Sequence, residues 1–114
     1  MTAQIIDGTA IAQKVRDEVK EKVAARIVAG KSQPGLATVL VGDRVDSAAY
    51  VGMKQKACAE LGMTSYHHPV PADINQEDLE KLIKELNADP KVNGILVQLP
   101  LPSHLDEERV LQLI

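Results

Sequence analysis

Aromatic residues and cysteines are scarce in this sequence. Of its 114 residues none is Phe or Trp, two are Tyr and one is Cys. A core must therefore be built from Val, Ile, Leu and Ala, which suits the packing of helices on a parallel sheet. A single cysteine excludes an internal disulfide and is typical of a reducing compartment. The length allows one domain with a real core, but not two.

Long apolar runs and blocks of like charge are also missing. No run approaches membrane-spanning length, and the first residues lack a signal-peptide pattern. The 13 basic and 16 acidic residues are spread along the chain and give a net charge of −3, so no basic stripe is available for phosphates. We therefore expect a cytoplasmic protein without a membrane or nucleic-acid partner.

What the chain does contain is an alternation of amphipathic stretches and short apolar runs. The runs predict strands near 36–41, 64–69 and 93–98, and the second, less apolar, is expected nearer an edge. Helices are predicted over 10–28, over 47–61 with Asp46 or Ser47 as N-cap, after Asn75, and from Asp106 with Val110, Leu111 and Ile114 facing inward. This order predicts a three-layer α-β-α domain of the α/β class with a mostly parallel sheet.

The first helix has an apolar residue at every fourth position. The row is formed by Ile11, Val15, Val19, Val23 and Ile27. Such a row drifts around a helix, so we expect this face to wrap obliquely over the body of the domain. Before it, Asp7 offers N-cap chemistry, and Ile5 and Ile6 begin either a short strand or an extended arm.

The helix over 47–61 carries polar side chains where a core-facing stripe is expected. At about 100° per residue, Ser47, Tyr50 and Lys54 share one stripe with Cys58. For Lys54, either the ammonium reaches past its neighbours into water or it lines a site, and the three aligned polar residues make the two readings about equal. Tyr50 either packs or stacks on a flat ligand. Cys58 is read as a small core residue.

Gln98 ends the third apolar run with a polar side chain. In an open parallel sheet ligands bind beyond the carboxyl ends of the strands. If the first and third strands are neighbours, Gln98 faces Tyr50 and Lys54 across one cleft. The alternative is a strand-end amide that bonds loop backbone.

Metal and nucleotide motifs are not found. His67 and His68 are adjacent on a strand and point to opposite faces, so they cannot share a metal. Tyr50-x-x-x-Lys54 resembles the pair of short-chain dehydrogenases, but the glycine-rich phosphate loop of that family is absent. We therefore predict no metal and no cofactor-binding residue in this chain.

Four segments together carry a specific resemblance. They are Ile6-Asp7-Gly8, Val39-Leu40-Val41-Gly42-Asp43, Ser47-x-x-Tyr50-Val51-x-x-Lys54-x-Lys56-Ala57, and Gly94-Ile95-Leu96-Val97-Gln98-Leu99-Pro100-Leu101-Pro102. At this spacing the chain resembles the N-terminal catalytic domain of bifunctional methylenetetrahydrofolate dehydrogenase/methenyltetrahydrofolate cyclohydrolase from Ile5 onward. Arg44-Val45-Asp46 departs from the proline and small residues common there.

The resemblance implies roles for individual residues. Lys54 is the catalytic lysine, assisting hydride loss from the methylene bridge and attack of water on the methenyl cation. Gln98 hydrogen-bonds Lys54 and holds it productive. Tyr50 stacks on the folate, and Ser47 supports the loop. The substrate-binding residues implied are Tyr50, Ser47, Leu99 and Pro100.

The resemblance also implies a longer parent enzyme. Residues 1–114 correspond to its folate-binding catalytic domain, cut before an NADP-binding Rossmann domain. The parent oxidises 5,10-methylenetetrahydrofolate with NADP and hydrolyses the product to 10-formyltetrahydrofolate, in one-carbon metabolism and purine biosynthesis, as a homodimer. For the isolated chain we expect little or no activity. The alternative is a non-catalytic α/β folding unit or interaction module.

Overall fold

A computed structural model describes residues 2–114 and gives the element order predicted from the sequence. The elements are α1 (Gly8–Val28), β1 (Gly35–Val41), α2 (Val45–Leu61), β2 (Thr64–Val70), α3 (Gln76–Ala88), β3 (Gly94–Val97) and α4 (Glu107–Gln112). A single helix is thus followed by a β-α-β-α-β-α series.

The three strands form one parallel sheet in the order β2-β1-β3. Leu36 of β1 pairs with Ser65 of β2 on one side and with Gly94 of β3 on the other. The central position of β1 explains its apolar sequence, because both of its faces are covered by helices. β2 lies at an edge, as predicted, and β3 ends one residue before Gln98.

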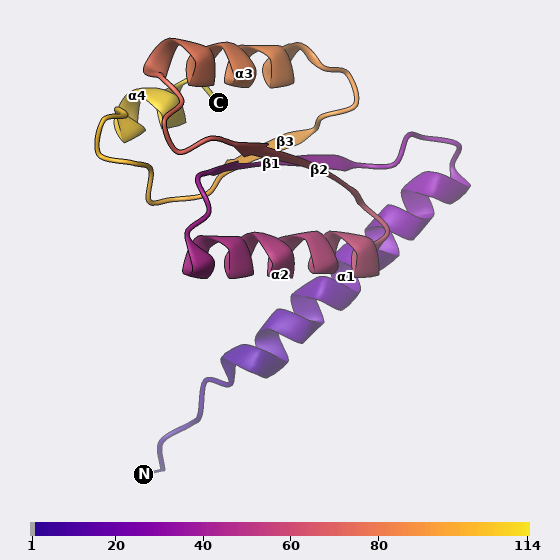
Figure 1. Ribbon diagram of the computed structural model, residues 1–114. Helices are drawn as coiled ribbons and strands as arrows, with labels where there is room; N and C mark the ends of the chain where they lie inside the picture. The colour runs from indigo at the N-terminus through magenta and orange to yellow at the C-terminus, as the bar shows by residue number, and fades with distance from the viewer. Residues whose placement is uncertain (1) are drawn as a thin grey trace.

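Helices cover both faces of the sheet and complete the predicted three layers (Figure 1). α3 and α4 lie on one face, and α2 with the end of α1 lies on the other. The main core fills the space between the sheet and the α3/α4 layer. Its buried members are Ala37, Val39, Val41, Leu79, Ile83, Leu86, Val97, Leu101, Leu105 and Val110.

The N-caps of α3 and α4 are those expected, whereas that of α2 is not. Asn75 Oδ1 accepts the Asp78 N–H at 2.7 Å, and Asp106 accepts the Arg109 N–H. α2 instead begins at Val45, and its N-cap Arg44 makes no side-chain capping bond. The predicted cap at Asp46 or Ser47 was wrong because the helix starts earlier. Asp46 lies in the first turn, where a negative charge favours the helix dipole.

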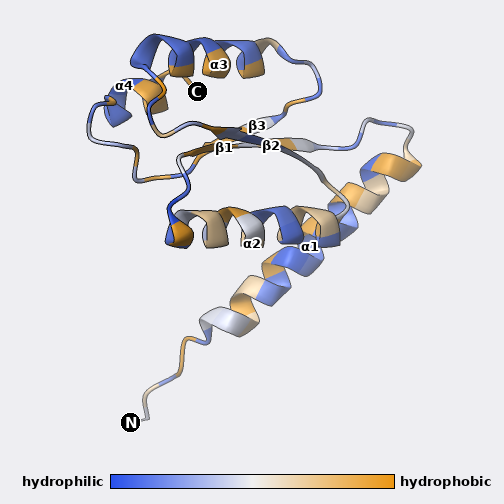
Figure 2. Cartoon of the chain, in the orientation of Figure 1, coloured by the Kyte–Doolittle hydropathy of each residue, from blue (hydrophilic) through white to orange (hydrophobic). Residues whose placement is uncertain are grey.

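The apolar row of α1 is largely exposed, contrary to the prediction that it wraps over the body. Val23 is buried, but the side chains of Ile11, Val15 and Ile27 are about half exposed, at 52, 52 and 46%. α1 meets α2 near its C-terminal end, and its first half runs away from the sheet with hydrophobic residues along it (Figure 2). Residues 2–7 precede it without regular structure.

α4 also buries less than expected. Val110 is fully buried, but Leu111 and Ile114 are 41 and 49% exposed, so the predicted inward direction of these two side chains was wrong. A six-residue helix turns only one side to the core, and Leu113 packs there instead.

Candidate active site

Lys54 and Gln98 meet near the carboxyl edge of the sheet, where the chain leaves neighbouring strands for opposite faces. β1 leads to α2 on one face, and β3 leads toward α4 on the other (Figure 1). A crevice at such a switch point is the usual ligand site of an open parallel sheet. Lys54 comes from α2 and Gln98 from the residue after β3.

A short chain of hydrogen bonds joins these two residues. Lys54 Nζ donates to Gln98 Oε1 at 2.7 Å, and Gln98 Nε2 donates to the Leu99 carbonyl at 3.0 Å. The second bond fixes which end of the amide faces the lysine, since only Oε1 can accept from an ammonium. The predicted contact between Lys54 and Gln98 is therefore present, and the two readings of Gln98 coexist.

Lys54 is partly buried, and its partner is neutral. Among residues 2–114 no carboxylate lies within 4.0 Å of its ammonium. An amide accepts a hydrogen bond without compensating the positive charge. One donor of the ammonium is used by Gln98, and two are left for other acceptors. Lys54 therefore combines a fixed direction with an unneutralised charge, which suits it to polarise a substrate.

Ser47, Tyr50 and Lys54 follow one another by about one turn along α2, as predicted, but they differ in burial. The buried residues of α2 are Ser47, Val51 and Cys58. Tyr50 is 57% exposed, one turn before Lys54, so its ring has a free face for stacking. Ser47 is 3% exposed and its N–H donates to Asp46 Oδ1. Its side chain is therefore largely removed from the surface where a ligand would lie.

Leu99 and Pro100 lie on the exposed segment that follows Gln98. Leu99 is 38% exposed, and the Leu99–Pro100 peptide bond is cis. Pro100 contributes to a pocket of about 290 Å³ above the ends of β1 and β3. Its other lining residues are Val41, Gly42, Asp43, Arg44, Ala72, Leu101 and Pro102.

The loop from β1 into α2 consists of Gly42, Asp43 and Arg44, and Asp46 follows in the first turn of the helix. Arg44 Nε lies 2.7 Å from Asp46 Oδ1, and this hydrogen bond lowers the pKa of the Asp46 carboxyl. Asp43 adds a second carboxylate beside Gly42. A dinucleotide pyrophosphate binds where a glycine-rich loop offers several N–H groups without opposing charge. A loop with the single glycine Gly42, followed by the carboxylate of Asp43 and an arginine already paired with Asp46, does not offer that array and does not fit a pyrophosphate.

One residue with a clear bond to this region escaped the sequence reasoning. Glu107 Oε1 accepts the backbone N–H of Leu101 at 2.8 Å. The available signal was that Leu101 carries the only N–H between Pro100 and Pro102, and such a donor needs a partner when buried.

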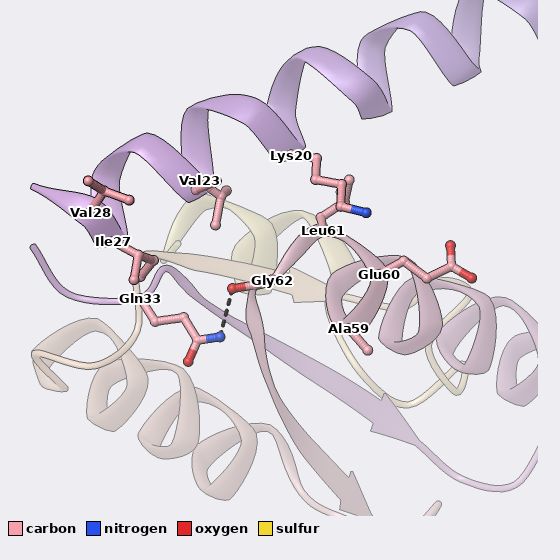
Figure 3. Close-up of a pocket in the computed structure, with 10 residues that line it drawn as sticks. Lys20, Val23, Ile27, Val28, Gln33, Ala59, Glu60, Leu61 and Gly62 are labelled. Atoms are coloured by element: carbon pink, nitrogen blue, oxygen red, sulfur yellow. Dashed lines mark hydrogen bonds between the residues drawn. The ribbon is translucent and has the colours of Figure 1, made fainter.

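A second, apolar pocket lies at the C-terminal end of α2 (Figure 3). It has a volume of about 590 Å³, and its lining includes Val23 and Ile27 of α1 and Leu61 of α2. Gln33 Nε2 donates to the Gly62 carbonyl across its wall. No residue predicted to act in the site lines it.

Within residues 2–114 there is no group of three or more His, Cys, Asp and Glu that could hold a metal ion. None of the helices described is long and apolar enough to cross a membrane.

The fold and the pair define a class, an α/β domain with a lysine–glutamine pair at the switch point of a parallel sheet. Residues 6–114 match the tetrahydrofolate dehydrogenase/cyclohydrolase family, catalytic domain. The chain belongs to this family, as its four sequence segments predicted.

Solved structures of similar proteins agree. The bifunctional methylenetetrahydrofolate dehydrogenase/cyclohydrolase FolD of Campylobacter jejuni is 41% identical, with a TM-score of 0.93 over 97% of this chain. A methylenetetrahydrofolate dehydrogenase from the silkworm Bombyx mori is 37% identical, with a TM-score of 0.94 over 99%. The Trypanosoma brucei dehydrogenase-cyclohydrolase, solved with NADP cofactor and inhibitor, is 39% identical, with a TM-score of 0.89 over 100%. The chain spans 39% of the length of each of these proteins.

Proposed function

We propose that this chain binds a reduced folate, 5,10-methylenetetrahydrofolate or its methenyl product, and supplies the lysine side of a dehydrogenase/cyclohydrolase site. The observation that carries this proposal is the Lys54–Gln98–Leu99 hydrogen-bond chain at the switch point, in a chain of this family. Lys54 is the proposed catalytic residue, and Gln98 holds its ammonium in place. Tyr50, Leu99 and Pro100 form the proposed binding surface, and Ser47 supports the loop beside it.

The cyclohydrolase step requires only water, a bound folate and the Lys54 side of the cleft. Water adds to the methenyl carbon, a C–O bond forms, and the bond from that carbon to N5 breaks to give the 10-formyl product. One proton of the water passes to N5 and the other is released. A positioned lysine can assist this proton transfer, and the fixed amide limits the directions its Nζ can take. Holding the group in place contributes to rate by reducing the orientational freedom lost in the transition state.

The oxidation step needs a nicotinamide cofactor as hydride acceptor. The residues described do not fit its pyrophosphate, so we assign cofactor binding to a further domain of a longer parent enzyme. Support comes from the Trypanosoma brucei relative, which was solved with NADP and of whose length this chain spans 39%. We infer NADP for the parent and a place in cytoplasmic one-carbon metabolism that feeds purine biosynthesis.

Binding of 5,10-methenyltetrahydrofolate tests the proposal directly. We expect titration of the 114-residue chain to give measurable binding that is weakened in both Tyr50→Ala and Lys54→Met. Lys56→Met is the matched control, because Lys56 lies on the same helix with its side chain 79% exposed and only a 4.0 Å contact to Glu60. It should bind like wild type.

Two results would contradict the proposal. Absence of binding by the wild-type chain would favour the non-catalytic folding unit. Equal loss in Lys54→Met and Lys56→Met would show that only the general positive charge matters.

A further inference from the structure

The segment that follows β3 is held by one hydrogen bond at each end. At its start the Gln98 N–H donates to the Val39 carbonyl at 2.9 Å, continuing the pairing with β1. Three residues later the Leu101 N–H donates to Glu107 Oε1 at 2.8 Å. Between these anchors lies the Leu99 carbonyl, which accepts the side-chain amide of Gln98.

At the second anchor only the Leu101 N–H can donate a backbone hydrogen bond, and Glu107 accepts it. Pro100 and Pro102 have no N–H, so Leu101 carries the sole donor of that tripeptide. Its side chain is buried in the main core, at 7% exposure, and water is largely excluded from the peptide group beside it. A carboxylate is a stronger acceptor than a neutral oxygen, which makes this bond a firm restraint.

The restraint acts close to Gln98. The peptide group that Glu107 binds, between Pro100 and Leu101, adjoins the peptide group whose carbonyl belongs to Leu99. A rotation of the Pro100–Leu101 peptide plane therefore also moves the Leu99–Pro100 peptide plane, which carries the Leu99 carbonyl. The Leu99 carbonyl in turn decides the orientation of the Gln98 amide, and hence the oxygen offered to Lys54.

We propose that Glu107 is a positioning residue for the Lys54–Gln98 pair. It acts through the Leu101 N–H and the Leu99 carbonyl, without contact to substrate. Its relevance to catalysis rests on the proposed function, but its effect on Gln98 does not.

The chain offers a matched control in Glu108. Both glutamates lie in the first turn of α4, so removing either takes one negative charge from the same helix start. Glu108 makes only a 3.4 Å side-chain contact with Gln112 on the surface. If only charge or helix stability matters, Glu107→Ala and Glu108→Ala should have the same effect. If Glu107 positions Gln98, only Glu107→Ala should change the behaviour of the Gln98 side chain.

Nuclear magnetic resonance of the 15N-labelled chain gives the test, far below the melting temperature. The side-chain NH₂ of Gln98 is assigned by its loss in Gln98→Ala. In wild type it should exchange with solvent more slowly than that of exposed Gln4. In Glu107→Ala we expect this exchange to become roughly three- to tenfold faster, as for loss of one hydrogen bond. The Leu101 amide signal should shift as well.

The conservative variant separates positioning from mere stability. Glu107→Gln keeps an acceptor oxygen and should restore most of the slow exchange, and Glu108→Ala should match wild type. Unchanged Gln98 exchange in a folded Glu107→Ala would overturn the proposal. If Glu107→Ala does not fold, Glu107→Asp decides, because its side chain is one carbon too short for the bond to the Leu101 N–H. It should shift the Leu101 amide and speed the Gln98 exchange, and a shifted Leu101 amide with unchanged Gln98 exchange would overturn the proposal.

Folate affinity links this inference to function. If wild type binds methenyltetrahydrofolate, Glu107→Ala should weaken binding by a similar factor and Glu107→Gln by less. If wild type does not bind, the proposed function fails, while the exchange of the Gln98 amide still reports whether Glu107 positions it.

Discussion

Lys54 Nζ and Gln98 Oε1 are 2.7 Å apart although 44 residues separate them in the chain. The bond connects the layer of α2 with the end of β3, and its acceptor is uncharged. That combination determines what loss of the lysine should do to stability.

Lys54→Met should change the free energy of unfolding by less than about 1 kcal/mol at pH 7, because one bond to a neutral amide in a partly buried place is lost. The methionine can cover the same apolar surface that the lysine stem covers. Urea unfolding of both proteins measures the difference. A loss of more than about 2 kcal/mol would show that the charge is paired and stabilising.

Arg109→Ala should destabilise the chain much more than Glu108→Ala. Glu80 is 7% exposed, and its Oε1 lies 3.0 Å from Arg109 Nε, which joins α3 to α4. Removing the arginine leaves a buried carboxylate without its partner, at a cost of about 1–3 kcal/mol. Urea unfolding again measures it, and Arg109→Ala combined with Glu80→Gln should recover part of the loss. Equal stability of Arg109→Ala and wild type would contradict this.

Cys58 should react slowly with thiol reagents and make stability fall at alkaline pH. Burial raises the pKa of its thiol above the ordinary value of 9.0. The folded state therefore keeps a proton that the unfolded chain loses, so stability decreases as pH rises from 9.0 through the folded pKa. Reaction with dithionitrobenzoate should be fast only in denaturant. Cys58→Ala should lack this part of the pH dependence. If the free energy of unfolding falls equally steeply with alkaline pH in Cys58→Ala and wild type, the prediction is wrong.

Two glycine-to-alanine substitutions should change stability in opposite directions. A Cβ on Gly35 would collide with the Lys91 carbonyl oxygen and lie 2.7 Å from the Tyr66 ring, so Gly35→Ala should cost about 1–3 kcal/mol. A Cβ on Gly52, inside α2, meets nothing within 4 Å. Gly52→Ala should stabilise by about 0.5–1 kcal/mol through helix propensity. Thermal unfolding of the two variants checks both signs.

The fold could be predicted because its local signals agree. The apolar runs predicted β1, β2 and all of β3, and Asn75 and Asp106 cap the helices they were expected to cap. The contact between Lys54 and Gln98 was expected if the first and third strands are neighbours, and the strand order β2-β1-β3 meets that condition. The substrate-binding and catalytic roles stay predictions, which the binding experiments address.

The errors concern which face of a helix meets a neighbour. Periodicity identifies an apolar row on α1, but not whether a partner covers it, and Ile11 and Val15 are exposed. The same limit applies to Leu111 and Ile114 on α4. The bond between Glu107 and Leu101 depends on where a loop folds back, which no periodic pattern contains.

The central place of β1 in the order β2-β1-β3 has a consequence during synthesis on the ribosome. β1 and α2 emerge early, but the side of β1 that receives β3 waits for residues 94–97. At typical translation rates the 44 residues from Lys54 to Gln98 take roughly 2–9 s. For that time Leu36 to Val39 present an unpaired strand edge, which is open to pairing with other nascent chains. The candidate site and the pairing of this side of β1 are thus completed together, when the same short segment arrives.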